Sequence, residues 1–461
     1  MATRQKIQLD LAFPKTGAGE ARERLGEGTE ASATNAVTES PTAIAGPCME
    51  AIVDRDNLRK ALARVRRNKG APGIDGMSVE ALALHLKDHW PALRAQLLEG
   101  SYKPHPVRRV DIPKASGGTR PLGIPTALDR FIQQAAMQVL QTAWDGTFSA
   151  SSHGFRPERS AHQAVRAAQE FIASGHRIVV DIDLEKFFDR VNHDILMGLM
   201  AKRVSDPRIL RLVRGFLTSG VLEDGLVGPI DEGTPQGGPL SPLLSNLMLD
   251  ELDKELERRG HRFARYADDC NIYVRSPRAG ERVMASVERF LVRRLKLKIN
   301  KEKSAVAPPH RRKFLGFSFT SGSTPRRRIA PQAVARFKGR VRALTMRTRG
   351  ASLVQIVKEL SRYLIGWRGY FGFCETPSAL SRLDQWIRRR LRSIAWKQWK
   401  RGRTRFAELR RRGVGYDLAA QTAGSPHGPW RNSNGPALAI ALTNAFLANI
   451  GLANLASANA V

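Results

Sequence analysis

Two adjacent aspartates, Asp268 and Asp269, lie between two short runs of strand-forming residues in the segment RYADDCNIYV. Adjacent carboxylates repel each other, so the pair needs a physical reason. A polar hairpin turn is one reason, because aspartate side chains accept hydrogen bonds from nearby backbone. Half of a metal site is another, because carboxylate oxygens are common ligands of Mg²⁺. Taken alone, the pair favours the turn.

A second acidic strand changes this balance. The segment RIVVDIDLEKFFD places Asp181 and Asp183 near the C-terminal end of an apolar run. In a strand, these two aspartates would share one face with Val179. Carboxylates from both segments could then converge, and two divalent ions would remove their repulsion. The spacing itself leaves both Asp181 and Asp183 as candidates.

The elements that would carry these aspartates mix strands and helices. Residues 177–188 predict a strand that leads into a turn and a helix, and residues 262–276 predict a hairpin. Residues 78–100 favour two helices, the second beginning near Pro91. A further helix is predicted for residues 129–144, with Asp129 as a possible N-cap. The sequence therefore predicts an α+β fold.

The two ends of the chain differ from its middle. Residues 1–46 are rich in Ala, Gly, Thr and Glu without clear periodicity, which is typical of a disordered segment. Strand signals stop near residue 330, and three helices are predicted after it. Residues 415–461 begin with a turn-rich stretch and continue into one apolar, Ala- and Leu-rich helix.

The chain of 461 residues carries a formal net charge of +32. This much positive charge opposes compaction, so a polyanionic partner is the simplest explanation, and nucleic acid is the expected polyanion. Residues 381–413 concentrate the charge, with 13 Lys and Arg against the two acids Asp384 and Glu408. A generally basic, solvated surface is the alternative.

Cysteine usage and hydropathy exclude several classes of protein. The three cysteines form no CxxC pair, which argues against structural zinc and for a reducing compartment without disulfides. No apolar run approaches the roughly 20 residues of a membrane span. The N-terminus lacks the apolar core of a signal peptide.

Six sequence blocks follow one another along the chain: IPKASGGTRPLGIP, DLEKFFDRVNHDIL, TPQGGPLSPLLSNLMLDELD, YADD, LKINKEKS and FLGF. In this order they resemble the successive blocks of a reverse transcriptase. More narrowly, they resemble the reverse transcriptase/maturase encoded within bacterial group II introns. The resemblance covers most of the chain beyond the N-terminal segment. It implies a right-hand polymerase with α-rich fingers, a ferredoxin-like palm and an all-α thumb and maturase region.

The resemblance implies a role for each acidic residue. The family's first catalytic aspartate corresponds to Asp183, not Asp181. Its aspartate pair corresponds to Asp268 and Asp269. Asp183 and Asp268 would bind two catalytic Mg²⁺ ions, helped by the backbone carbonyl of Leu184. Asp269 would complete the acidic cluster.

The resemblance also implies a nucleotide pocket. Lys114 and Arg120 match a basic pair suited to the incoming triphosphate, although both could be solvated charges on an exposed ribbon. Phe188 matches the aromatic residue that would clash with a 2′-hydroxyl and so favour deoxynucleotides, although it could belong to the core. Gln236 matches a residue that lines the nucleotide pocket.

The helices after residue 330 resemble the thumb and maturase region, and SRYLIGWRGYFGF matches its motif. Leu364, Trp367 and Phe371 have the spacing of a helical core face. The basic helix after them would follow the phosphates of a folded intron RNA, with its tryptophans packed or stacked on bases. The candidate RNA contacts are Arg388, Arg389, Arg390, Lys397 and Lys400.

These features predict an RNA-directed DNA polymerase that copies group II intron RNA and assists splicing and mobility as a maturase. Its expected partners are intron RNA, an RNA template with a DNA primer, dNTPs and target DNA. No association with a membrane is expected. The expected location is the bacterial cytoplasm, or the nucleoid when the protein acts on DNA. A maturase with a silent polymerase, or a domesticated reverse transcriptase with a host role such as defence, are the alternatives. The resemblance further implies an endonuclease-lacking type.

The expected organisation has four parts. Residues 1–46 form the disordered segment, and residues 47–330 form the fingers and palm. Residues 331–413 form the helical thumb and maturase domain, and residues 414–461 form a short tail region without an endonuclease.

Overall fold

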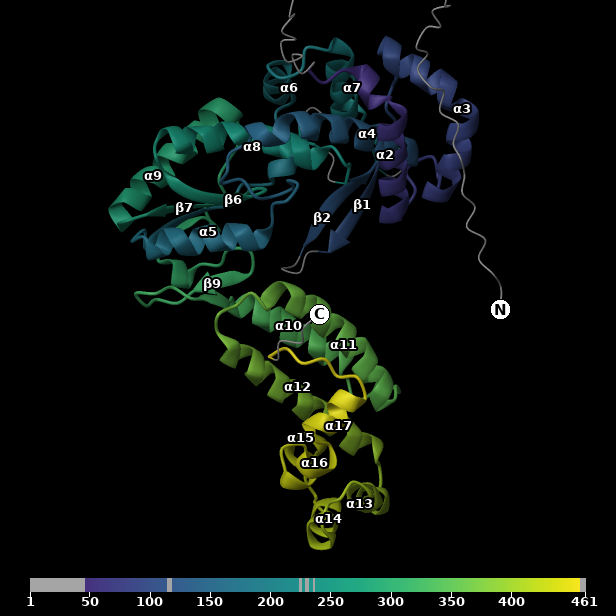
Figure 1. Ribbon diagram of the computed structural model, residues 1–461, viewed down its shortest axis with the longest axis vertical. Coiled ribbons are helices and arrows are strands. Elements are labelled where there is room, and N and C mark those ends of the chain that lie inside the picture. The colour runs from purple at the N-terminus through teal and green to yellow at the C-terminus, as the bar shows by residue number, and fades with distance from the viewer. Residues whose placement is uncertain (1–45, 114–117, 224–225, 229–231, 235–236, 457–461) are drawn as a thin grey trace, which may run out of the picture. The chain divides into compact units, whose positions relative to one another are not determined.

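The computed structural model describes residues 46–113, 118–223, 226–228, 232–234 and 237–456 (Figure 1). Almost all of the segment predicted to be disordered lies outside these ranges, as do Lys114 and Gln236. The chain forms two compact units. The first comprises the residues up to Ser160, Asp181–Ile272 and Glu281–Ala305; the second comprises Ala161–Val180, Tyr273–Gly280 and the residues from Val306 onward.

Helices and strands are interspersed up to β10, and the chain is helical after it (Figure 1). Within the described ranges the strands are β1 (Val107–Pro113), β2 (Thr119–Ile124), β3 (Ile178–Ile182), β4 (Val221–Glu223), β5 (Leu226–Gly228), β6 (Arg262–Tyr266), β7 (Asp269–Val274), β8 (Ala305–Ala307), β9 (Phe317–Phe319) and β10 (Arg327–Ile329). The mixture of helix and sheet is the predicted α+β class.

The longer helices before β10 are α2 (Arg55–Asn68), α3 (Val79–Glu99), α4 (Ala127–Trp144), α5 (Ala161–Ala173), α6 (His193–Ala201), α7 (Pro207–Thr218), α8 (Ser241–Arg258) and α9 (Pro277–Phe290), with a short α1 (Met49–Ile52) before them. Single turns connect some of these elements, namely η1 (Asp145–Thr147), η2 (Phe187–Asp189), η3 (Leu291–Leu295) and η4 (Pro309–Arg311). After β10 come α10 (Pro331–Leu344), α11 (Leu353–Phe371), α12 (Pro377–Gln398), α13 (Gly402–Arg411), α14 (Tyr416–Ala423), α15 (Pro429–Asn432), α16 (Pro436–Ala441) and α17 (Asn444–Asn449).

In the described part of the chain the strands form three sheets, in the orders β2-β1-β4-β5, β6-β7-β3-β8 and β10-β9. In the first sheet β1 and β2 are antiparallel, with Arg120 opposite Ile112. In the second sheet β7 is hydrogen-bonded to both β6 and β3. The hairpin predicted for residues 262–276 is therefore confirmed, and the two acidic strands are neighbours in one sheet.

Residues 78–100 form one helix, α3, and the prediction of two helices is wrong. Pro91 lies inside α3 and is exposed, so its missing N–H removes one backbone hydrogen bond without ending the helix. The buried residues Leu82, Leu86 and Trp90 continue one apolar face up to that point, and Leu97 extends it beyond. Burial of that face outweighs the local penalty of the proline.

Thr126, and not Asp129, is the N-cap of α4. The Thr126 hydroxyl oxygen accepts a hydrogen bond from the Asp129 backbone N–H at 3.0 Å. The buried Asp129 carboxylate instead accepts hydrogen bonds from the Tyr102 hydroxyl at 2.8 Å and from the Thr126 hydroxyl at 2.7 Å. Asp129 thus ties the first turn of α4 to the chain that leads into β1.

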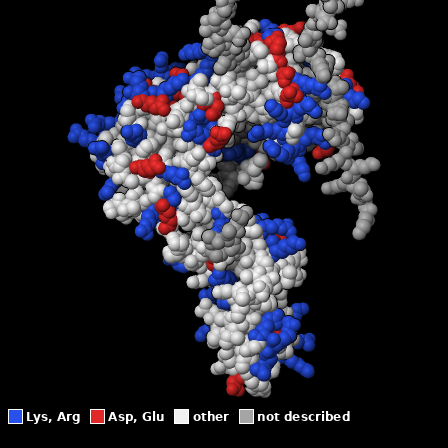
Figure 2. Space-filling model, viewed as in Figure 1, with Lys and Arg blue, Asp and Glu red and all other residues white. Residues whose placement is uncertain are grey.

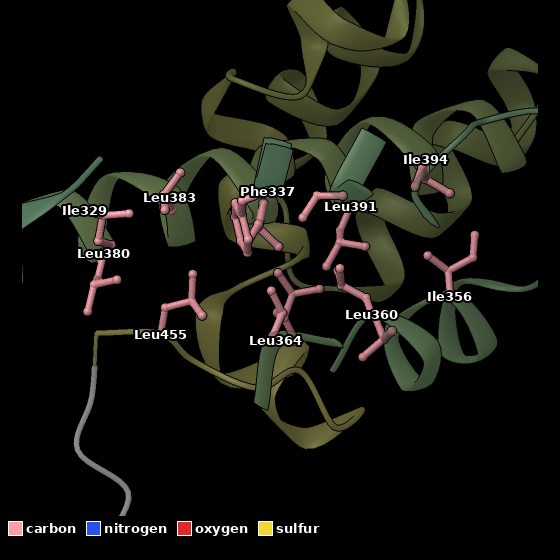
Figure 3. Packing of buried hydrophobic residues seen from close by; sticks show 14 of the residues in the cluster. Ile329, Phe337, Ile356, Leu360, Leu364, Leu380, Leu383, Leu391, Ile394 and Leu455 are labelled. Carbon is pink, nitrogen blue, oxygen red and sulfur yellow. The ribbon is translucent and has the colours of Figure 1, made fainter. Parts of the chain in front are cut away.

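The second unit has its own apolar core between α10, α11 and α12 (Figure 3). Phe337 of α10, Leu360 and Leu364 of α11, and Leu391 of α12 are all at most 1 % exposed. Trp367 and Phe371 are partly buried and pack against this cluster. The core face predicted for Leu364, Trp367 and Phe371 is therefore confirmed.

The apolar segment near the C-terminus forms two short helices, α16 and α17, and not the single predicted helix. Thr443 separates them, because its hydroxyl oxygen accepts a hydrogen bond from the Phe446 backbone N–H at 3.0 Å and so starts α17. Leu447 and Leu455 join the core of the second unit. No described helix has the length and apolar character needed to span a bilayer.

We predict that Leu364→Ala lowers the free energy of unfolding of the second unit by about 2–5 kcal/mol, because it leaves a cavity in a packed core. The neighbouring side chain of Ile365 is 64 % exposed, so Ile365→Ala should change stability by less than ~0.5 kcal/mol. Denaturant titration of both variants provides the measurement. Equal losses from the two substitutions would contradict the assigned core.

Candidate functional site

Asp183 directly follows β3 and is held there by the segment that precedes β8. The Asp183 backbone N–H donates to the Ser304 hydroxyl oxygen at 2.9 Å. The Asp183 carbonyl accepts from the Asn300 backbone N–H at 2.8 Å. Leu184 continues this pairing through an isolated bridge to Ile299. The backbone at the end of the acidic strand is thus anchored on two consecutive residues.

The YADD segment forms the turn between β6 and β7. Ala267 has a φ of 56°, a left-handed backbone conformation that residues other than glycine seldom adopt. Asp268 follows it and is half-buried, whereas Asp269 is exposed and begins β7. The two adjacent carboxylates therefore lie in different environments, and Asp268 is the one withdrawn from water.

Asp268 and Asp183 influence each other electrostatically. Burial raises the pKa of Asp268 above its ordinary value, and the negative charge of Asp183 raises this pKa further. The positive charges of Arg120 and Arg265 oppose the rise. Lys303 balances part of the charge, since its Nζ lies 3.7 Å from Asp183 Oδ1. The structure thus brings together Asp183 and Asp268, two of the three predicted aspartates, from neighbouring strands.

Asp181, the alternative to Asp183, lies within β3 and has a different neighbour. Its Oδ1 is 3.0 Å from the side-chain nitrogen of Asn271, in the amide orientation that satisfies both groups. Asn271 belongs to β7, so this contact also spans the two neighbouring strands. Asp181 therefore has a hydrogen-bonding partner beside the sheet, whereas Asp183 stands at the strand end with Asp268.

A divalent cation fits this pair by charge, because it would remove the repulsion that Asp268 experiences from Asp183. A complete three-residue cluster is not assembled: among the described residues, no three His, Cys, Asp or Glu side chains are grouped closely enough to hold a metal ion. Asp269, the third member of the predicted cluster, is exposed. Reverse transcriptases as a class depend on divalent metal ions, which agrees with the charge of the pair.

Two residues predicted for the nucleotide pocket, Arg120 and Phe188, lie in the described part of the chain. Arg120 lies on β2, exposed, and its charge acts on Asp268. Phe188 lies in η2, half-buried beside the fully buried ring of Phe187, and its carbonyl accepts from the Thr234 N–H at 2.6 Å. Lys114 and Gln236 lie outside the described ranges.

The two glycines that follow Gln236 allow a close approach of backbone. A Cβ on Gly237 would lie 2.5 Å from the carbonyl oxygen of Gly123 in β2. A Cβ on Gly238 would lie 2.3 Å from the Gln133 side-chain oxygen. Gly237 also has a φ of 137°. Gly237 therefore permits a close approach to β2, the strand that carries Arg120, and Gly238 permits a close approach to the Gln133 side chain of α4.

The basic residues of the second unit have unequal surroundings. The Arg390 guanidinium donates to the Thr345 hydroxyl oxygen at 2.6 Å and to the Thr345 carbonyl at 3.1 Å, so it closes the end of α10. Arg389 lies over the ring of Trp430 at 4.1 Å. Lys397 and Lys400 are exposed. Figure 2 shows further Lys and Arg side chains gathered near α13.

The tryptophans interleaved with these basic residues are packed in the protein. Trp396 is 0 % exposed and Trp399 is 9 % exposed, and both belong to a second apolar cluster with residues of α13, α14 and α16. The sequence left two arrangements open for these tryptophans, packing in the protein or stacking on bases. Trp396 and Trp399 are packed in the protein.

Sequence reasoning recognised the block LKINKEKS without assigning its residues a role. In the structure Ser304 holds the backbone of Asp183, and Lys303 lies beside its carboxylate. The sequence did contain a signal for this role. Lys303 and Ser304 follow the acidic blocks and lie just before an expected strand. Only the pairing of this segment with the end of β3 shows which aspartate the two residues serve.

We predict that Asp268→Asn raises the melting temperature of the metal-free protein at neutral pH by about 2–4 °C, the shift expected for ~1 kcal/mol in a domain of this size. The raised pKa of Asp268 means that the folded state disfavours the charged form of this carboxyl. The charged carboxylate therefore lowers the free energy of unfolding by its full amount at pH values above the folded-state pKa of Asp268. The difference from the wild type should disappear as the pH falls below the ordinary aspartate value of about 4. Thermal unfolding in a chelator provides the measurement, and Asp269→Asn at the exposed neighbouring position is the matched control. A lower melting temperature for Asp268→Asn would contradict the assigned electrostatics.

Family comparisons match two consecutive parts of the chain. A model described as "Reverse transcriptase (RNA-dependent DNA polymerase)" matches residues 112–319 and so includes Asp183, Asp268 and Asp269. A model described as "Group II intron, maturase-specific domain" matches residues 334–413, which contain α11, α12 and α13. The acidic strands and the basic helices thus fall in different family segments.

The chain is also similar to individual proteins. Protein YkfC of Escherichia coli is 35% identical over 283 residues, which cover 53% of this chain and 74% of YkfC. Group II intron-encoded protein LtrA of Lactococcus lactis is 44% identical over 160 residues, but these cover only 26% of LtrA. A solved structure titled "Partial Cas6-RT-Cas1--Cas2 complex" aligns with a TM-score of 0.35 and 24% identity over 53% of this chain and 42% of that chain, which is too distant to carry an argument. From the family segments and YkfC, the chain belongs to the group II intron-type reverse transcriptase/maturase family, whose members are RNA-directed DNA polymerases with a maturase domain.

Proposed function

We propose that this chain copies group II intron RNA into DNA at a centre formed by Asp183 and Asp268, and that it assists intron splicing and mobility as a maturase. The observation that supports the catalytic part most directly is the electrostatic coupling of these two carboxylates from neighbouring strands. Charge repulsion between half-buried carboxylates has no structural benefit, so it indicates a site that receives a cation.

In this proposal two Mg²⁺ ions are held by Asp183, Asp268 and the backbone carbonyl of Leu184, with Asp269 completing the acidic cluster. When bound, such ions supply activation of the primer 3′-hydroxyl and stabilisation of the leaving pyrophosphate. Ser304 and Asn300 hold the Asp183 backbone in place for this task.

The nucleotide pocket is proposed from Lys114, Arg120, Phe188 and Gln236. Arg120 is suited to the triphosphate, because its charge already acts at Asp268. Phe188 is proposed to exclude the 2′-hydroxyl of a ribonucleotide, and its half-buried ring on η2 is compatible with contact to a sugar. The close approach of Gly237, the residue after Gln236, to Gly123 of β2 supports the assignment of Gln236.

The maturase role is proposed as binding without chemistry. The basic surface of the second unit would hold folded intron RNA through its phosphates, and the RNA itself would catalyse splicing. Of the candidate contacts, Lys397 and Lys400 present exposed charges, whereas Arg388, Arg389 and Arg390 are half-buried. The expected partners remain intron RNA, template with primer, dNTPs and target DNA, in a bacterial cytoplasm or on its nucleoid.

Asp268→Ala is predicted to abolish DNA synthesis on an RNA template with a DNA primer, while binding of intron RNA stays within about twofold, because the carboxylate serves chemistry and not RNA affinity. Primer extension with Mg²⁺ and dNTPs, alongside filter binding of intron RNA, measures both properties. Asp194→Ala, which removes an exposed carboxylate from α6, is the control for charge alone.

Undiminished extension by Asp268→Ala would reject the catalytic assignment. Absence of incorporation by the wild type on every RNA template would favour a maturase with a silent polymerase. Extension without affinity for group II intron RNA would favour a domesticated enzyme with a host role.

For the RNA surface, the double variant Lys397→Gln/Lys400→Gln is predicted to weaken intron RNA binding and to reduce the slope of log affinity against log salt by about 1–2, because up to two phosphate contacts are lost. The control, Lys60→Gln/Lys87→Gln, removes the same charge from α2 and α3 of the first unit. A salt titration compares the slopes. Identical slopes for the two double variants would show that net charge, and not this helix end, governs binding.

A further inference from the structure

Arg265, the residue before Tyr266 in the YADD turn, is a buried arginine with all five of its N–H donors engaged. Its side chain is 0 % exposed. Nε and one Nη2 hydrogen donate to the two oxygens of Asp253, at 2.7 and 2.5 Å. The remaining donors reach the Ser152 hydroxyl at 2.8 Å, the Asn246 side-chain oxygen at 3.1 Å and the Ala267 carbonyl at 2.9 Å.

The bond to Ala267 distinguishes this arginine from an ordinary buried ion pair. Asp253 alone would satisfy the charge of Arg265, and two apolar side chains of the same volume would be no less stable there. The guanidinium instead reaches forward two residues to the carbonyl of Ala267, whose backbone is left-handed. That carbonyl belongs to the peptide bond that leads directly into Asp268.

A second contact of the turn is with Gly154. A Cβ on Gly154 would lie 2.2 Å from the Ala267 backbone nitrogen, so only glycine permits this approach. The Gly154 carbonyl accepts from the Asn246 side-chain nitrogen at 2.8 Å. Asn246 thus contacts both Gly154 and Arg265, and the turn at Ala267 is held between them.

All of these groups lie on elements of the first unit. Asn246 and Asp253 belong to α8, seven residues apart and hence on the same face of the helix. The segment around Ser152 and Gly154 joins β6, since the His153 N–H donates to the Arg265 carbonyl at 2.9 Å. The turn at Ala267 therefore packs against a connected set of mostly polar residues: Arg265, Asp253, Asn246, Ser152 and Gly154.

We propose that Arg265 is a positioning residue of the polymerase reaction: through the Ala267 carbonyl it holds the turn so that the Asp268 carboxylate stays at the end of β3, beside Asp183. This inference rests on the proposed function of Asp268. Arg265 is fully buried, and it contacts the turn through its hydrogen bond to the Ala267 carbonyl, so it serves the reaction by holding the backbone of the turn. Loss of the hydrogen bond between Arg265 and the Ala267 carbonyl therefore lowers the rate of the chemical step and leaves the affinity for template and primer unchanged.

The first test compares Arg265→Lys with Arg203→Lys. Each substitution weakens an arginine pair with a fully buried aspartate of α8, Asp253 in one case and Asp250 in the other, but only Arg265 reaches the turn. The single-turnover rate of nucleotide addition should fall about 10- to 100-fold in Arg265→Lys, since lysine cannot supply the forked donors and an error of about 1 Å suffices for such a loss. Arg203→Lys should stay within about twofold. Template-primer affinity should be unchanged in both, and the Mg²⁺ concentration for half-maximal rate should rise in Arg265→Lys alone.

The second test leaves the buried Arg265–Asp253 pair intact and so remains informative if Arg265→Lys folds poorly. Gly154→Ala places a methyl group against the Ala267 nitrogen, whereas the same substitution at Gly198 of α6 meets open space. The same kinetic pattern is expected for Gly154→Ala, and wild-type behaviour for Gly198→Ala. Melting curves establish the folded fraction for every variant.

A wild-type single-turnover rate in folded Arg265→Lys, or in folded Gly154→Ala, would overturn the proposal. Equal losses of rate in Arg265→Lys and Arg203→Lys would also overturn it, because the effect would then follow α8 stability and not the turn. Either result leaves the role of Asp268 intact if Asp268→Ala abolishes synthesis. Extension by Asp268→Ala would instead remove the proposed function on which this inference rests.

Discussion

The repulsion between two carboxylates at the ends of neighbouring strands is the constraint on which the rest of the first unit depends. Burial disfavours the charged form of Asp268, and the negative charge of Asp183 adds to this penalty. A chain selected only for stability would place amides or apolar side chains there. The surrounding structure must therefore hold both groups where they would not stay by themselves.

Two independent supports meet this requirement. On the Asp183 side, Ser304 and Asn300 bond the backbone just after β3, and Lys303 offsets part of the charge. On the Asp268 side, the Arg265 guanidinium and Gly154 hold the left-handed backbone at Ala267. Both supports act mainly on the backbone, so the carboxylates themselves remain available to a cation. Rigid backbone with available oxygen ligands is the arrangement that a polymerase centre requires.

Positive charge serves different purposes in different parts of the chain. Arg265 and Arg390 are held by hydrogen bonds and stabilise a turn and a helix end. Lys397 and Lys400, in the same basic stretch as Arg390, are exposed. The net charge of +32 therefore overstates the charge available to a nucleic acid, because some of it is already used inside the protein. Counting basic residues in a helix does not separate these two populations, whereas burial and hydrogen bonding do.

The sequence by itself determined the α+β class, the hairpin that carries Asp268 and Asp269, and the core face of α11, because these follow from periodicity and turn chemistry within short segments. The order of six blocks also gave the family. Local patterns failed where distant burial decides: Pro91 lies inside α3, Thr126 rather than Asp129 caps α4, and the last apolar segment forms two helices. Only the tertiary structure decided which carboxylates meet and what supports them. The pairing of β3 with β7 places Asp183 beside Asp268, and the approach of residues 152–154 and α8 to the turn gives Arg265 its partners. The contact between Ser152 and Arg265 joins residues 113 positions apart, and no spacing rule in a linear sequence encodes a separation of that length.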